Sequence, residues 1–159
     1  MKSKRFAVIA LTAVTLGLIA ARTVAAPISW DDLKLPERTS PAEVELTGFL
    51  LPIDYEGDDV YQFMLLPWAG ACSHTPPPPP DQVVLVTPEE PIQIERTYEA
   101  VSITGHLNRK RELSQFFLLD GVARIESEYR MRSAQVQSAN IATVPPPSGQ
   151  RNPWKFLKQ

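Results

Sequence analysis

Hydrophobic and polar residues alternate in several short runs of this chain, and alternation with a period of two predicts β-strands. The predicted strands cover residues 43–52, 60–67, 82–86, 98–108 and 115–126. Two of these runs carry a glycine in their middle, Gly48 and Gly105, which indicates a bend or bulge in the strand. The run at 82–86 is apolar in every residue after Gln82, which is typical of a buried strand.

The last predicted strand region contains Asp120-Gly121 between two apolar runs, which is the strongest hairpin signal in the chain. One bulged strand is the alternative. Helical structure is expected only in short pieces. Residues 28–37 predict one turn of helix that ends before Pro36, with Trp30 as a core residue, and the polar residues 129–137 predict a second short helix.

Five or six strands with no long amphipathic helix between them predict an all-β protein. The expected architecture is a small antiparallel OB-like barrel with short helical segments at the ends. A small β-sandwich fits the same number of strands and stays open as an alternative.

The N-terminus has the pattern of a secretory signal peptide, with a cationic start, an apolar run from Phe6 to Ala20 and small residues near Ala25. We therefore expect a signal peptide at 1–25, a single β domain at 26–137 and a flexible Pro-rich tail at 138–159, in a periplasmic protein. No later stretch has the ~20 apolar residues that a membrane span needs. The tail ends in a short basic and aromatic cluster, for which a solvated tail is the favoured interpretation over contact with a membrane.

The charge of the chain argues against nucleic-acid binding. Removing residues 1–25 takes away four of the sixteen Lys and Arg residues and none of the eighteen acids, so the net charge falls from −2 to −6. Proteins that bind nucleic acids by neutralising phosphates need the opposite balance.

The single cysteine, Cys72, stands two residues from His74 in a loop that continues with five prolines. One cysteine forms no intramolecular disulfide, so in an oxidising compartment it is buried, bound to a ligand or paired with another molecule. In an extended segment Cys72 and His74 project to the same side. A thiolate and an imidazole suit Zn(II) or Cu(I), which makes this pair the predicted metal site.

Two protein donors do not complete a metal site, and candidates for the remainder are His106, Asp81, Asp120 and Met64. His106 alternates with an apolar set in its predicted strand, which favours an exposed histidine over a ligand. The plainer alternative is that Cys72 is a small buried hydrophobic residue.

The prolines after His74 predict a stiff polyproline segment that positions the loop or offers a docking surface. The candidate partner-binding residues are Pro76, Pro77, Pro78, Pro79, Pro80 and Gln82. An enzyme is the weaker hypothesis. Cys72 and His74 could act as nucleophile and base, but the chain has no glycine-rich phosphate loop, nucleophile elbow or HExxH motif.

The runs "ISWDDLKLP", "VELTGFLLPID", "FMLLPWAGACSHTPPPPPDQVVLV" and "VSITGHL" resemble the DUF3299 family of exported bacterial proteins. Its hallmark block corresponds to Gly70, Cys72, His74, Pro76 to Pro79 and Gln82. Asp81 stands where the family usually has asparagine, which favours a role for an anion. The resemblance implies an envelope location and an ABC transporter component as partner.

These observations predict an exported, non-enzymatic accessory protein that binds a transition metal or a metal-transport partner through the loop at 70–82. The competing hypothesis is an interaction or scaffold module of the cell envelope with a structural thiol and no metal. A ligand-binding barrel that uses its open face is a third possibility.

Overall fold

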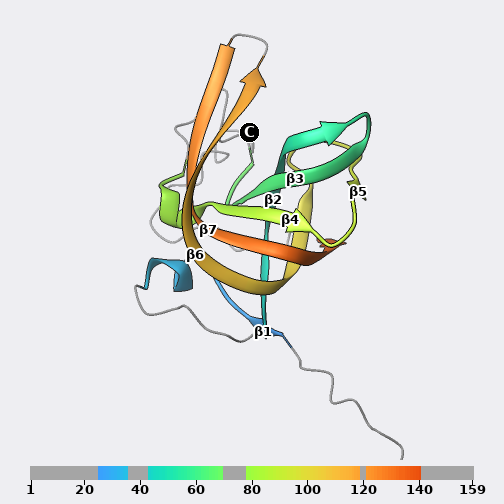
Figure 1. Cartoon of the computed structure of the whole chain (residues 1–159). Helices are drawn as coiled ribbons and strands as arrows, with labels where there is room; N and C mark the ends of the chain where they lie inside the picture. The colour runs from blue at the N-terminus through green and yellow to red at the C-terminus, as the bar shows by residue number, and fades with distance from the viewer. Residues whose placement is uncertain (1–24, 36–42, 70–77, 119–120, 141–159) are drawn as a thin grey trace, which may run out of the picture.

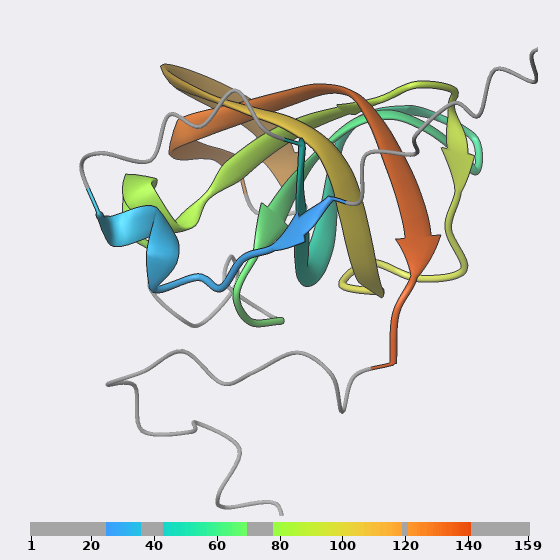
Figure 2. The same ribbon diagram turned by 90° about the horizontal axis from the view of Figure 1, so that it is seen from below.

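A computed structural model of the chain describes residues 25–35, 43–69, 78–118 and 121–140, which form an all-β fold (Figure 1). The seven strands are β1 (Ala26–Pro27), β2 (Glu43–Glu56), β3 (Asp59–Leu66), β4 (Val84–Pro88), β5 (Ile92–Gln93), β6 (Ala100–Leu118) and β7 (Gly121–Ser138). Two short 3-10 helices, η1 (Asp32–Lys34) and η2 (Pro80–Gln82), lie side by side at one end of the sheet (Figure 2).

The sheet has the strand order β1-β2-β6-β7-β4-β3-β5, and an additional β2–β3 pairing closes its five longer strands into a ring. The predicted all-antiparallel arrangement is wrong, because β1 pairs with β2 and β4 pairs with β7 in parallel. The reason is topological. Strand directions cannot alternate all the way round a ring with an odd number of members, so a five-stranded ring needs at least one parallel pair.

The β2–β3 hairpin turns at Gly57 and Asp58, with Glu56 opposite Asp59. Gly57 has φ of 61°, a left-handed conformation that glycine adopts without steric cost.

Gly48 in β2 provides space for Trp30. A Cβ atom at this position would lie 2.7 Å from Trp30 Cζ2 and 2.7 Å from the carbonyl oxygen of Leu66. Trp30 is buried, and its Nε1 donates a hydrogen bond to the carbonyl of Thr47 at 2.8 Å. The prediction that Trp30 is a core residue is therefore confirmed, and the mid-strand glycine serves close packing.

The predicted hairpin around residue 120 is confirmed by the pairing of Leu118 with Gly121. Its strands are much longer than expected, and their distal half projects beyond the ring (Figure 1). We call residues 112–118 and 121–127 the arm. The helix expected at 129–137 is wrong, because these residues belong to β7 and pair with both β4 and β6.

The core consists of two clusters, one on each face of β3 and β4. Phe63, Leu65, Val84 and Val86 face the first cluster, which includes Trp30 and Tyr129. The alternate residues of the same strands face the second cluster, which is formed by Leu51, Met64, Leu66, Trp68, Val83, Leu85 and Ile125. Burial on both faces explains why the run from Val83 to Val86 is apolar throughout. A search of the described residues for a helix long and apolar enough to cross a membrane found none.

Candidate functional site

The loop with the predicted metal site is anchored at both of its described ends. Residues 70–77, which include Cys72, His74, Pro76 and Pro77, lie outside the described residues. Before them, Trp68 packs in the second core cluster with 9% of its surface exposed. After them, Pro78 is buried and the chain passes into η2.

Gln82 is the strongest of these anchors. Its side chain is 3% exposed, and Nε2 donates hydrogen bonds to the carbonyl of Trp30 at 2.8 Å and to that of Asp81 at 3.1 Å. Gln82 is one of the partner-binding residues that the sequence predicts. The structure places its side chain in the interior, where it ties η2 to the segment that precedes η1.

Tyr129 in β7 makes the matching connection to η1. Its hydroxyl donates a hydrogen bond to the carbonyl of Leu33 at 2.6 Å, and its side chain is buried. Burial raises the pKa of the Tyr129 phenol, and the carboxylates of Glu128 and Asp81 add to the rise while Arg109 opposes it. Gln82 and Tyr129 therefore hold the two short helices against the ring.

Three residues next to the anchored end keep solvent contact. Pro79 is exposed and extended, with φ −62° and ψ 153°, while Pro80 and Asp81 are partly buried. The angles of Pro79 are those of polyproline II, the conformation that the sequence predicts for the prolines after His74.

The other predicted metal ligands do not gather in the described part of the chain. His106 is exposed in β6, opposite Glu43 of β2, on the face expected from its alternation with apolar residues. Met64 lies fully buried in the second core cluster, and Asp120 lies outside the described residues. Within the ranges that the structure describes, no group of three His, Cys, Asp or Glu side chains is placed to hold a metal ion.

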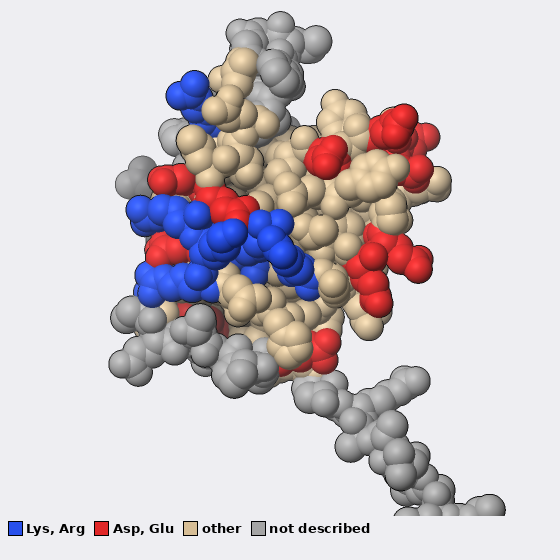
Figure 3. Space-filling model, in the orientation of Figure 1, with Lys and Arg blue, Asp and Glu red and all other residues tan. Residues whose placement is uncertain are grey.

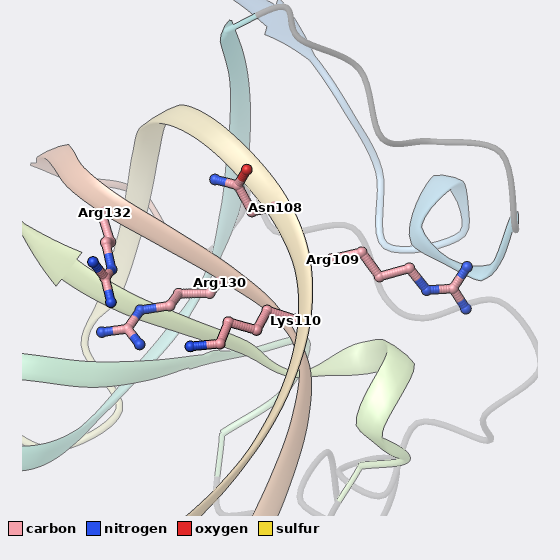
Figure 4. Close-up of a pocket in the computed structure, with 5 residues that line it drawn as sticks. All are labelled: Asn108, Arg109, Lys110, Arg130 and Arg132. Atoms are coloured by element: carbon pink, nitrogen blue, oxygen red, sulfur yellow. The ribbon is translucent and has the colours of Figure 1, made fainter.

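A basic pocket on β6 and β7 was missed by the sequence analysis. It has a volume of about 430 Å³ and is lined by Asn108, Arg109, Lys110, Arg130 and Arg132 (Figure 4). Lys110, Arg130 and Arg132 extend to the same side, whereas Arg109 points the opposite way toward η1 (Figure 4). The sequence signal was the run "NRKRE" at 108–112, and the helix expected at 129–137 concealed that Arg130 lies beside it.

Glu112 organises this pocket. Its Oε1 lies 2.7 Å from Lys110 Nζ, and Arg130 Nη1 donates to both carboxylate oxygens at 2.7 and 2.9 Å. The hydrogen bond from Lys110 is the main cause that lowers the pKa of Glu112. Burial opposes this shift, and Arg130 adds to it. Arg109 pairs instead with Glu128, which raises the pKa of the Arg109 guanidinium.

Basic side chains gather on one side of the face shown in Figure 3, whereas acidic side chains lie both among them and on the opposite side. Basic side chains form a band over the β6 and β7 side, while acidic side chains gather toward the β2–β3 turn, where Asp54, Glu56 and Asp58 are exposed. The molecule therefore presents a local basic surface although its net charge is −2.

A family model described as a protein of unknown function, DUF3299, matches residues 7–138. The chain belongs to the DUF3299 family. This confirms the family predicted from the sequence, while the role of the Cys-x-His block within the family stays a prediction. The crystal structure of a DUF3299 family protein (PA4066) from Pseudomonas aeruginosa PAO1 is similar to this DUF3299 protein, with a TM-score of 0.56 and 19% sequence identity. The similarity covers 74% of this chain and 97% of that chain, and it extends to the fold alone. A comparison with curated proteins found no match.

Proposed function

We propose that this DUF3299 protein is an exported, non-enzymatic accessory protein that binds a transition metal through the loop carrying Cys72 and His74. The observation that carries the proposal is the anchoring of this loop. Trp68 lies in a core cluster before it, and Gln82 is hydrogen-bonded to the Trp30 backbone after it. A weak pair of donors gains affinity when the protein holds its chain ends in place, because less entropy is lost on binding.

The donor chemistry favours a soft or borderline metal ion. Cys72 and His74 together suit Zn(II) or Cu(I), and each of these ions needs further donors to close its coordination shell. Asp81 is the nearest additional candidate along the chain, because it follows the prolines in η2 and keeps partial solvent access. His106 is the second candidate, from β6.

We propose further that the ring is an OB-like barrel. Strands β2, β3 and β4 are consecutive and pair in sequence, and β6 returns to lie beside β2. This spatial order is that of a Greek key, and OB-folds are five-stranded Greek-key barrels. Here β7 supplies the fifth strand, between β6 and β4.

The cellular setting that we propose is the periplasm, with the signal peptide removed after Ala25 and an envelope ABC transporter component as the partner. The apolar N-terminal run supports export. Metal binding in this compartment requires a cysteine that escapes oxidation, and coordination of the thiolate provides that protection.

The test is the metal content of protein purified from the periplasm, whose intact mass checks that the chain begins at Ala26. Wild type, Cys72→Ser and His74→Ala are equilibrated with Zn(II) or Cu(I) and a competing chelator, then analysed by mass spectrometry. We expect about one ion in the wild type and strong loss in both variants, with weaker binding below neutral pH because protons compete for both donors.

Ser73→Ala is the matched control, because it alters the same loop without removing a soft donor. Asp81→Asn and His106→Gln then identify the remaining ligands. Equal metal in the wild type and the Cys72 and His74 variants, or none in any of them, would contradict the proposal.

The competing function is a scaffold module without metal, and the exposed Pro79 is the observation that favours it. An exposed polyproline segment offers a preformed surface to aromatic grooves of a partner. In that case the wild type would hold no metal, and Cys72→Ser would mainly lower the free energy of unfolding.

A further inference from the structure

The basic pocket holds more positive charge than its own carboxylate compensates. Lys110 and Arg130 share Glu112 as their ionic partner. Arg132 is exposed and makes no ion pair within the described ranges of the chain. Three cations and one anion therefore lie around a pocket with a volume of about 430 Å³.

Arg130 is the least satisfied of these side chains. Its side chain is only 16% exposed, and Glu112 accepts hydrogen bonds from Nη1 alone. The buried Nε of Arg130 has no hydrogen-bond partner among the described residues. A partly buried cation with unused donors is stabilised by any additional anion that comes close to it.

The arrangement is also preorganised. Glu112 fixes Arg130 and Lys110 on one side of the pocket, and Arg132 extends to the same side in Figure 4. The three cations come from two paired strands, with Asn108 opposite Arg130. Guanidinium groups match the oxygen geometry of phosphate, and a lysine adds a compact charge.

We propose that this pocket binds the phosphate group of an anionic ligand, independently of the Cys72 and His74 loop. Two sources supply this chemistry, a soluble phosphate and the head group of an anionic phospholipid. The arm provides a way to separate them. Leu113 and Val122 are 58% and 53% exposed, respectively, and both belong to the arm next to the pocket.

Strand pairing places these two apolar residues on the outer face that also carries Arg130. Leu113 lies directly opposite Glu126, and Val122 is four residues from Glu126 in β7, so all three project to one side. Arg130 is four residues further along the same strand, and the residues between are alternately buried and outward-facing. An anionic bilayer would contact both the cations and the apolar residues, whereas a soluble phosphate would contact the cations alone.

The first experiment titrates the full mature protein with inorganic phosphate at low salt, by calorimetry or NMR. Arg132→Gln should weaken binding by about two- to fivefold, as expected for one exposed charge, and Arg132→Glu should weaken it further. Arg96→Gln is the matched control, because Arg96 is also exposed but lies outside the pocket. Added salt should weaken binding by the wild type.

The second experiment measures sedimentation with vesicles of phosphatidylcholine alone and with added phosphatidylglycerol. If the ligand is a lipid head group, the protein binds only the anionic vesicles, and Leu113→Gln reduces this binding without changing the phosphate titration. Leu35→Gln is the control, because Leu35 is 52% exposed outside the arm. Phosphate binding without vesicle binding identifies a soluble ligand.

Circular dichroism of each variant confirms that the exposed substitutions leave the fold intact. The proposal is overturned if Arg132→Gln changes the binding of neither phosphate nor anionic vesicles. It is also overturned if Arg96→Gln weakens this binding as much as Arg132→Gln does. Because none of these assays contains a transition metal, their failure is distinguishable from failure of the metal-binding proposal.

Discussion

Replacing Gln82 with methionine should lower the free energy of unfolding by about 1–3 kcal/mol, because the buried Trp30 carbonyl loses its donor. Gln82 is 3% exposed, and the hydrogen bond to Trp30 is 2.8 Å long. The second bond, to Asp81 at 3.1 Å, is local in sequence and adds less. Methionine is flexible and similar in length, so the loss reports hydrogen bonding more than a cavity.

Urea unfolding followed by tryptophan fluorescence measures this change. Small proteins have urea m-values of about 1–3 kcal/mol/M, so the midpoint should fall by about 1 M at an unchanged m-value. Gln93→Met is the matched control. Gln93 is exposed, and its only side-chain hydrogen bond in the described ranges is a long contact to Asp59 at 3.4 Å. Its replacement should change stability by less than about 0.5 kcal/mol.

A loss below about 0.5 kcal/mol for Gln82→Met would refute this reasoning, because it would show that water satisfies the Trp30 carbonyl once the amide is gone. An equal loss for Gln93→Met would do the same, since the effect would then be one of replacing glutamine by methionine anywhere in the protein. A changed m-value would point instead to altered compactness of the native or unfolded state.

Two further stability predictions follow from the packing of Trp30 and Tyr129. Gly48→Ala should lower the free energy of unfolding, measured in urea, by about 1–3 kcal/mol, because the new Cβ would lie 2.7 Å from Trp30 and from the Leu66 carbonyl. A variant as stable as the wild type would show that Trp30 moves aside freely. Tyr129→Phe should be less stable than the wild type at neutral pH through loss of the bond to Leu33. The difference in the free energy of unfolding between the wild type and this variant should narrow as the pH rises above the ordinary pKa of 10.0. The raised pKa keeps the folded phenol protonated, so the contribution of Tyr129 to stability disappears as the phenol ionises in the unfolded chain. A stability difference that stays constant up to about pH 11 would contradict the idea that burial raises the pKa of Tyr129.

The β-strand content of this protein could be predicted because its strongest signals are local. The alternation around Gly48 and the Asp120-Gly121 pair each depend on neighbouring residues, and the structure confirms the strand and the hairpin that they predict. The direction of strand pairing could not be predicted in this way. It depends on how many strands close the ring, and the pattern of the sequence is compatible with five or six.

The second half of β7 was mistaken for a helix for an identifiable reason. Its buried residues Tyr129, Met131 and Ala134 are spaced by two and then by three positions. Ser133 has a positive φ of 48°, and the register with β4 shifts between Thr87 and Pro88 at the same place. A bulge changes the phase of the alternation, so the period of two is lost in the sequence although the strand continues.

The two candidate sites differ in how far the sequence could reveal them. Cys72 and His74 are only two residues apart, so the chemistry of their thiol and imidazole donors is evident from the sequence alone. The basic pocket joins residues 108–110 of β6 with Arg130 and Arg132 of β7, and it exists only because the two strands pair. The buried hydrogen bond of Gln82 could not be predicted for the same reason, since its acceptor on Trp30 is 52 residues away in the chain.

The anchoring of the loop between β3 and β4 bears directly on how its chemistry can be tested. The described residues before positions 70–77 pack in the second core cluster through Trp68, and those after them are held through Gln82 to Trp30, so neither attachment involves Cys72 or His74. Substitutions at Cys72 or His74 leave these attachments in place. If the loop serves metal binding, such variants should keep a cooperative unfolding transition close to that of the metal-free wild type. If instead the thiol belongs to the core, Cys72→Ser should destabilise the protein where His74→Ala does not, because only the cysteine would lose apolar packing.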